Sequence, residues 1–247
     1  NYLAQMGTMA MSVGHEINNP LTYVISNSEY ILEDILPRLR TLQRETPETR
    51  AVYDELKMLL NEIDEGAEHI RRVVDELGIL ARSATDITQV YPGEAIKSAL
   101  RMVGPALNSS VSLTHHVSVS RPISINASLL VQVLINLLTN AVHAVQGIVD
   151  PHIEVRCFEG SGHAIIEIGD NGSGIRPELL GRIFDPFFTT KPVGEGTGLG
   201  LAVCRKLVER MSGAMTLSSS LGKGTTVRVS IPLSLQPTEA AESAPEV

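Results

Sequence analysis

The sequence predicts an α+β protein in which an N-terminal two-helix hairpin is followed by an α/β region. Two observations predict this class. Apolar residues recur every three or four positions over roughly the first eighty residues, whereas from Ile87 onward short alternating segments and apolar helical segments follow one another. We therefore expect domains at residues 1–85 and 86–235, and a disordered tail at 236–247 that is rich in Pro, Ala, Glu and Ser.

The first helix is expected from about Tyr2 to about Gln43. Pro20 and Pro37 interrupt it, and each removes one helical hydrogen bond, so Pro37 marks either a second bend or an earlier end. The apolar positions of this helix are Leu3, Met6, Ala10, Val13, Ile17, Leu21, Val24, Ile31 and Ile35.

A turn at Glu45–Thr49 precedes the second helix, with Thr46 as its cap and Pro47 in the first helical position. The second helix carries apolar residues four and three apart, with one small position at Gly66. They are Val52, Leu56, Leu59, Ile63, Ile70, Val73, Leu77 and Leu80. Two helices cannot cover so long a stripe, so we expect a homodimeric four-helix bundle. The alternative is a hairpin that packs on its own downstream domain.

His15 lies outside the apolar stripe of the first helix, so packing does not explain it. Pro20 leaves the carbonyl of Glu16 without its helical partner and loosens the turn that carries His15. Asn19 lies one turn after His15 on the same face, where its amide can hold a water or a phosphoryl group. Glu16 can fix the ring tautomer or take a proton. The setting favours a nucleophilic imidazole over a solvated histidine without a function.

The composition restricts the partners of the chain. With 20 basic and 28 acidic residues its formal net charge is −8, so sequence-independent binding to nucleic acid or an anionic membrane is not expected. Cys157 and Cys204 lack metal-ligand spacing and are interpreted as reduced, buried residues. No apolar run suggests a membrane span, so we expect this fragment to be cytoplasmic and free of membrane contact, with any membrane or sensor segment upstream.

The α/β region begins at Ile87–Tyr91. His115 and His116 are interpreted as strand side chains, because no carboxylate or cysteine at ligand spacing accompanies them. Helices are expected at Pro92–Val103, Ser128–Val145 and Leu199–Met211, and strands at Val111–Val119, Ile153–Phe158, Ala164–Ile168, Ala214–Ser218 and Thr225–Ile231.

Asn136 and Asn140 are four residues apart inside an apolar helix and therefore share one face. Burying two amides is unfavourable unless they find partners. Their oxygens, together with waters, suit a magnesium ion bound to phosphates. His143, near the end of the same helix, either touches phosphate or is a surface histidine.

A strand leads into Asp170-Asn-Gly172-Ser-Gly174. The glycines let the backbone turn tightly and approach a ligand, and Asp170 offers an acceptor for the exocyclic amine of adenine. Many β-turns have this composition, so the turn alone is a weak indication. Its position after a strand and before a helix strengthens the interpretation.

Aromatic residues from Phe184 to Phe188, and then Lys191, precede a glycine-rich segment that leads directly into a helix. Backbone amides at such a helix start bind phosphates, and the polar segment before it suits a lid over a nucleotide. The residues expected at this nucleotide site are Phe184, Lys191, Gly196, Thr197, Gly198, Leu199 and Gly200. Gly222-Lys-Gly224-Thr225 joins the last two strands and on its own would be an ordinary hairpin loop.

Taken together, these motifs resemble the transmitter core of bacterial two-component sensor histidine kinases. They stand in the order of the H, N, G1, F, G2 and G3 boxes: His15 to Pro20, Asn136 with Asn140, Asp170 to Gly174, Phe184 to Phe188, Gly196 to Gly200, and Gly222 to Thr225. The resemblance implies a dimerisation and phosphoacceptor hairpin followed by a Bergerat-type ATP-binding α/β sandwich. It also implies the use of ATP and Mg²⁺, and a response regulator receiver domain as partner.

The resemblance assigns roles to single residues. His15 would be phosphorylated, with Glu16 as its acid/base partner and Asn19 positioning water for phosphatase action. The remaining assignments are Asn136 and Asn140 to magnesium, Asp170, Gly172, Gly174 and Thr225 to the nucleotide, and Gly196 to Gly200 to the phosphates and lid. At His143 some relatives have Lys or Arg, so its phosphate contact is the departure from the pattern.

The family resemblance also bears on the reaction type. Related ATP hydrolases, such as gyrase and the Hsp90 chaperones, carry a water-activating glutamate one turn before the metal-binding asparagine, where this chain has Asn136. Without that base, attack by water should be slow, which favours a kinase over an ATPase. The rival functions are a transmitter whose net activity is dephosphorylation through Asn19, and a pseudokinase that binds nucleotide as a dimeric scaffold.

Overall fold

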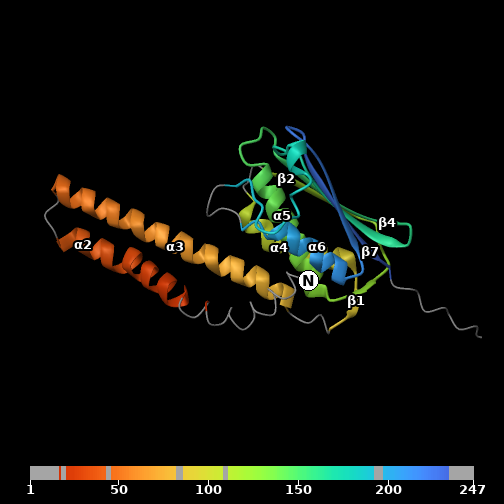
Figure 1. The fold of residues 1–247 in the computed structure, drawn as a ribbon, viewed down its shortest axis with the longest axis horizontal. Helices are drawn as coiled ribbons and strands as arrows, with labels where there is room; N and C mark the ends of the chain where they lie inside the picture. The colour runs from red at the N-terminus through yellow and green to blue at the C-terminus, as the bar shows by residue number, and fades with distance from the viewer. Residues whose placement is uncertain are drawn as a thin grey trace, which may run out of the picture. The chain divides into compact units, whose positions relative to one another are not determined.

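The computed structural model describes residues 17, 21–42, 46–81, 86–107, 111–191 and 197–233. The chain divides into two compact units (Figure 1). Unit 1 comprises Asn1–Ser83 and Arg182–Val203, and unit 2 comprises Ala84–Gly181 and Cys204–Val247. A helical hairpin and a mixed sheet covered by helices confirm the predicted fold class. The functions assigned to residues 1–85 and 86–235 stay predictions.

The first helix of the hairpin changes its winding ahead of Pro37. Residues 21–30 are helical, the π-helix η1 spans Ile31–Ile35, and the α-helix α2 spans Leu36–Leu42. The backbone N–H of Leu36 donates to the carbonyl of Ile31, five residues earlier. Pro37 has no N–H to give an α-type bond, so the wider turn occurs where an α-helix would lose a donor. The helix therefore passes through Pro37 and does not end there.

The second helix, α3 (Pro47–Ala81), starts where the sequence predicts. The backbone N–H of Thr49 donates to Thr46 Oγ1 at 3.2 Å, and the N–H of Thr46 donates to Thr49 Oγ1 at 2.9 Å. This reciprocal pair satisfies two backbone donors at a helix end, in the manner of a capping box. Thr46 and Pro47 together fix the start of α3.

We expect Thr46→Ala to lower the free energy of unfolding by about 1 kcal/mol, because one N–H of the first turn loses its acceptor. Denaturant unfolding followed by circular dichroism would measure the change. Thr46→Ser keeps the hydroxyl and should stay close to wild type. Equal destabilisation by both substitutions would show that the cap is not the cause.

The two hairpin helices pack through a narrow stripe. Leu60, Ala67 and Val74 of α3 recur every seven residues and are buried, as are Leu21 and Ile25 of the first helix. The hydroxyl of the buried Ser28 donates to the carboxylate of Asp64 at 2.9 Å and so links the two helices. This contact adds a polar constraint on the register of an otherwise apolar packing.

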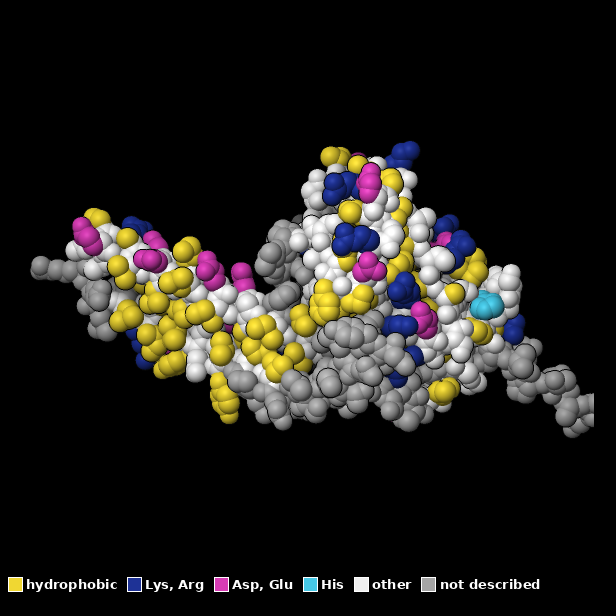
Figure 2. All heavy atoms as spheres, viewed as in Figure 1, with side chains coloured by type: hydrophobic (Ala, Val, Ile, Leu, Met, Phe, Trp, Pro, Cys, Tyr) yellow, Lys and Arg dark blue, Asp and Glu magenta, His cyan; other side chains and the backbone are white. Residues whose placement is uncertain are grey.

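The predicted heptad stripe of α3 lies elsewhere, on the exposed surface. Within one chain its residues Val52, Leu56, Leu59, Ile63 and Ile70 are between 38% and 64% exposed. Figure 2 shows hydrophobic side chains gathered along the hairpin helices. A large contiguous apolar surface of this kind marks an interaction site in a soluble protein. The stripe is what a dimeric bundle would cover, and the dimer remains a proposal.

Unit 2 is built on a mixed five-stranded sheet in the order β2-β4-β5-β7-β6. The strands are β2 (Ser112–Val117), β4 (His152–Gly160), β5 (His163–Asp170), β6 (Ala214–Ser220) and β7 (Gly224–Pro232). β2 runs parallel to β4, and the other neighbours are antiparallel. A second sheet pairs β1 (Thr88–Val90) with β3 (Ile123–Ile125), a strand that the sequence did not predict.

Helices cover one face of the sheet (Figure 1). They are α4 (Pro92–Val103), α5 (Ala127–Ala144) and α6 (Gly200–Arg210), with short turns at η2 (Gly104–Ala106) and η3 (Pro177–Leu179). Alternate residues of β4, β5 and β7 form the buried layer beneath the helices. By length and composition α5 passes as a membrane-spanning helix, which corrects the expectation that no such run exists, but it packs against α4 and the sheet in this core.

Both cysteines are free and fully buried, as predicted. Burial raises the pKa of the Cys157 thiol to about 11, so this side chain behaves as a small hydrophobic residue. Cys204 lies on α6 and its sulfur approaches the carbonyl of Val133 on α5 at 3.9 Å.

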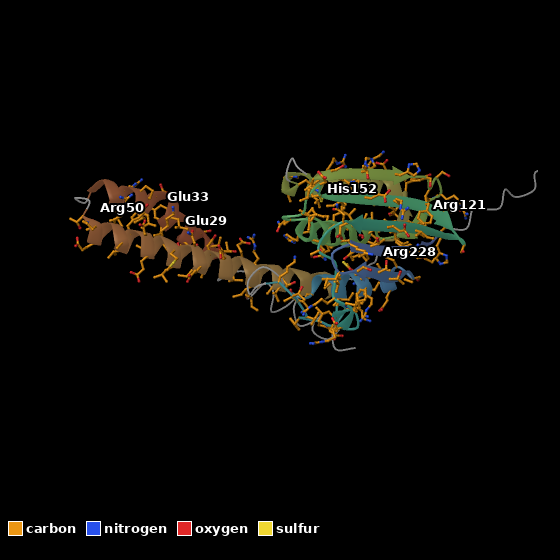
Figure 3. All side chains as sticks on the ribbon, turned by 90° about the horizontal axis from the view of Figure 1, so that it is seen from above. Glu29, Glu33, Arg50, Arg121, His152 and Arg228 are labelled. Atoms are coloured by element: carbon orange, nitrogen blue, oxygen red, sulfur yellow. The ribbon has the colours of Figure 1, made fainter. Side chains whose placement is uncertain are left out.

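The face of the sheet that bears Glu167 carries a charged row across three strands. Glu167 of β5 is only 4% exposed and accepts from Arg156 of β4 and Arg228 of β7, each at 2.7 Å. Arg228 is labelled in Figure 3. Buried carboxylates need such partners because removing them from water is unfavourable. The row fastens the central strands to one another.

Candidate functional site

Two asparagines interrupt the apolar helix α5. Asn136 Oδ1 accepts from Gln132 Nε2 at 3.2 Å, while Asn136 Nδ2 is buried without a hydrogen-bond partner in the described chain. Asn140, one turn on, is half-buried, and its side chain has no hydrogen bond to any described residue. Unsatisfied buried amides are uncommon in folded proteins. The Asn136 amide is thus a candidate for a polar ligand, and the ligand role of both asparagines stays a prediction.

The ends of α5 are tied to the rest of unit 2. Asn126 caps the start, because its Oδ1 accepts from the backbone N–H groups of Ser128 and Leu129 at 3.0 and 3.3 Å. At the other end, the carbonyl of Ala144 accepts from the N–H of Ser173 at 3.1 Å. The last turn of α5 is thus bonded directly to the glycine-containing loop after β5. His143, on this last turn, is exposed.

Asp170 ends β5 with one carboxylate oxygen engaged. Its Oδ1 accepts from the N–H of Gly172 at 2.9 Å and from that of Thr225 at 3.2 Å. Among the described residues nothing donates to Oδ2, which leaves an acceptor for a ligand. Burial raises the pKa of Asp170 above its ordinary value, although the two backbone donors act in the opposite direction. The side chain suits recognition of an amine such as that of adenine.

Glycine is required at three positions around Asp170. A Cβ at Gly172 would lie 2.3 Å from the carbonyl oxygen of Ala144, one at Gly174 would lie 2.0 Å from that of Ser220, and one at Gly224 would lie within 1.8 Å of that of Asp170. Gly174 and Gly224 also have positive φ values of 65° and 94°. The loop after β5 and the β6–β7 turn are therefore packed backbone against backbone.

Two residues that the sequence did not single out hold these loops. Asn171 Oδ1 accepts from the N–H of His152, labelled in Figure 3, at 2.7 Å, and its Nδ2 donates to the carbonyl of Asp150 at 2.9 Å. Ser219 of β6 bonds to the loop after β5 and to the β6–β7 turn. Nothing in the run Ser218-Ser219-Ser220 distinguishes the middle residue, so sequence offers no signal for it.

The segment from Arg182 to Val203 belongs to unit 1. Arg182 lies over the ring of Phe188 at 4.6 Å, and Gly198 packs against the backbone of Phe187 with a positive φ of 68°. Thr197 Oγ1 accepts from the N–H of Leu199 at 3.2 Å just before α6 begins at Gly200. The predicted glycine-to-helix transition is thus confirmed, one residue later than expected.

The remaining predicted site residues lie in unit 1 or outside the described residues. Phe184 and Lys191 are half-buried in the segment of unit 1, and Leu199 is fully buried. His15, Glu16, Asn19 and Gly196 lie outside the described residues. Unit 2 contains the predicted residues Asn136, Asn140, His143, Asp170, Gly172, Gly174 and Thr225. The hydrogen bonds of Asp170 join Gly172 and Thr225 to it.

Comparison with known proteins identifies this arrangement. Residues 125–235 match the family model described as histidine kinase-, DNA gyrase B-, and HSP90-like ATPase. The chain is 32% identical over 237 residues to the sensor histidine kinase ZraS of Salmonella typhimurium, an alignment that covers 94% of this chain and 46% of ZraS. The chain is thus similar to sensor histidine kinases over nearly its whole length, and residues 125–235 match the ATPase family model.

A second sensor histidine kinase, the signal transduction histidine-protein kinase AtoS of Escherichia coli, is 32% identical over 95% of this chain and 36% of its own length. The chain thus spans less than half the length of these two curated kinases. Among solved structures, full-length ShkA in complex with AMPPNP has a TM-score of 0.68 at 22% identity, covering 92% of this chain and 46% of ShkA. That likeness confirms the fold, a helical hairpin followed by a Bergerat-type α/β sandwich.

Proposed function

We propose that this chain is the kinase core of a two-component sensor: unit 2 binds ATP with Mg²⁺, and the γ-phosphoryl group is transferred to His15. The phosphoryl group then passes to an aspartate of a separate response regulator. One observation carries the proposal: the similarity to sensor histidine kinases covers 94–95% of the chain, hairpin included, and is not confined to the ATPase region. Residues 1–85 would dimerise and accept the phosphoryl group, and residues 86–235 would bind ATP.

The nucleotide would bind through the unsatisfied polar groups of unit 2. Oδ2 of Asp170 accepts the adenine amine, and the glycines on either side allow the base to approach the backbone. Asn136 and Asn140 face the phosphates. Their amides fit a magnesium site, because the orphaned Asn136 amide presents either its N–H₂ or, after a half-turn, its oxygen. Bound Mg²⁺ supplies charge neutralisation for phosphoryl transfer.

The acceptor chemistry would take place on the hairpin. The neutral imidazole of His15 attacks the γ-phosphorus as the bond to ADP breaks, and Glu16 takes up the ring proton. Asn19 would position water when the same hairpin dephosphorylates the regulator. Pairing of two hairpins through the exposed stripe of α3 gives the homodimer. Since ATP is its substrate, this part of the protein works in the cytoplasm.

Incubation with ATP labelled at the γ-phosphate tests this function. We expect the chain to acquire label that is lost in acid and retained in base, and to acquire none when EDTA removes Mg²⁺. Asn140→Ala should reduce the initial rate by roughly tenfold or more, because even residues that only hydrogen-bond to the ligands of a metal typically contribute that much. Gln146→Ala, an exposed change just beyond the same helix, is the matched control. Wild-type labelling by Asn140→Ala would contradict the assigned metal site.

A further inference from the structure

Ser219 joins three segments of unit 2 through one hydroxyl group. It is the second-to-last residue of β6 and is half-buried. Its oxygen accepts from the N–H of Ile175 at 2.9 Å, it donates to the carbonyl of Gly224 at 2.9 Å, and it lies 2.9 Å from Thr225 Oγ1. The hydroxyl therefore connects the loop after β5, the β6–β7 turn and the start of β7.

The proton count fixes the direction of these bonds. A serine hydroxyl has one proton and two lone pairs. Its proton goes to Gly224, so both lone pairs accept, one from Ile175 N–H and the other from the hydroxyl of Thr225. Ser219 is then fully satisfied, and the hydroxyl proton of Thr225 is used in its bond to Ser219. Thr225 can meet the nucleotide only as an acceptor.

This network reaches Asp170 by two routes. The N–H of Thr225 donates to Asp170 Oδ1, and Gly224 is in close backbone contact with the carbonyl of Asp170. On the other side, Gly174 is in close contact with the carbonyl of Ser220. The contacts leave little room for the loops to move against each other, so the Ser219 bonds determine the position of the Asp170 carboxylate.

We propose that Ser219 is a positioning residue for base recognition. By holding Thr225 and the loop after β5, it directs Oδ2 of Asp170 at the exocyclic amine of the purine. It thereby sets the preference for 6-amino over 6-oxo purine nucleotides. The inference rests on the proposed function, since it requires adenine to bind at Asp170.

The test compares binding of ATP and inosine triphosphate, which has an oxygen in place of the 6-amine, to the full chain. In Ser219→Ala we expect ATP to bind about three- to tenfold more weakly, the range that corresponds to one lost hydrogen bond, while inosine triphosphate is little affected. The ratio of the affinities for ATP and inosine triphosphate should fall by the same factor. KM for ATP should rise in the labelling reaction, and the rate at saturating ATP should stay unchanged.

Three further variants make the test specific. Ser218→Ala removes an exposed neighbouring hydroxyl and should match wild type. Ser219→Thr keeps the hydroxyl and should retain the preference for ATP. Thr225→Val removes the other hydroxyl of the Ser219–Thr225 bond and should reduce the preference for ATP over inosine triphosphate by a similar factor. The double variant with Ser219→Ala should reduce that preference little further, because both changes break one network. Thr225→Val also decides the question if Ser219→Ala does not fold.

The outcomes separate this inference from the proposed function. Equal weakening of both nucleotides in Ser219→Ala, or an unchanged preference in both Ser219→Ala and Thr225→Val, would overturn the positioning role, because a purely structural hydroxyl affects both ligands alike. Wild-type protein that binds neither nucleotide would instead contradict the proposed kinase function.

Discussion

Asp170→Asn is expected to abolish ATP binding, with affinity reduced about hundredfold or more, while unit 2 stays folded. The asparagine oxygen can still accept from the N–H groups of Gly172 and Thr225, so the local structure is kept. Its N–H₂ group then replaces Oδ2, the oxygen to which nothing described donates. A donor would face the adenine amine, which is also a donor. Isothermal titration calorimetry measures the loss.

The same substitution should raise stability at neutral pH. Burial raises the pKa of Asp170, so the folded state disfavours its ionised form. The contribution of Asp170 to the free energy of unfolding is most favourable below the ordinary pKa of an aspartate. It declines as the pH rises from that pKa to the raised pKa of the folded state, and it is constant at higher pH. Asparagine does not ionise, so Asp170→Asn avoids this loss of stability above the folded-state pKa. The stability gained by the variant should disappear at a pH below the pKa values of both the unfolded and the folded state.

Thermal unfolding at neutral and acid pH measures this effect. Asp86→Asn, a change of the same type at an exposed position of unit 2, is the control and should change neither binding nor stability. An Asp170→Asn protein that binds ATP like wild type would remove Asp170 from base recognition. One that is strongly destabilised at neutral pH would show that the ionised carboxylate supports the fold.

His15→Gln should lose all acid-labile, base-stable label and still bind ATP with wild-type affinity. Glutamine is polar and of similar length but has no ring nitrogen that can form a phosphoramidate. His116→Gln, on the exposed surface of β2, is the matched control and should label normally. Equal label in wild type and His15→Gln would show that another residue is the acceptor. A combined loss of label and ATP binding would point to misfolding.

Local patterns were sufficient to predict most of the elements. Thr46 and Pro47 gave the start of α3, and alternation gave β4, β5 and β7, because caps and periodicity depend on neighbouring residues. β3 was missed because Ile-Ser-Ile is too short to show a period. The parallel pairing of β2 with β4 depends on contacts distant in sequence, which no local pattern contains.

Sequence patterns single out candidate site residues whose side-chain chemistry is unusual in its setting, and overlook residues that only hold loops in place. Asn136 and Asn140 stand out because amides in an apolar helix are unfavourable, and the orphaned Asn136 Nδ2 agrees with that reasoning. Ser219 and Asn171 do not stand out, because serine and asparagine are common in turns and their partners lie in other loops. In α3 the apolar period alone did not show that Ala67, outside the predicted stripe, packs with Leu21 and Ile25 of the first helix.

The π-helical turn at Ile31–Ile35 has a consequence for the phase of the hairpin. A π-turn holds one residue more than an α-turn, so the side chains of residues 21–30 are rotated by about 100° about the helix axis compared with an unbroken α-helix leading into α2. A heptad pattern extended from Leu36 toward the N-terminus therefore assigns the wrong residues before Ile31 to the side that faces α3. The burial of Leu21 and Ile25 and the 41% exposure of Val24 reflect this offset. One residue of winding thus decides which side of the first helix faces α3 and which side faces outward.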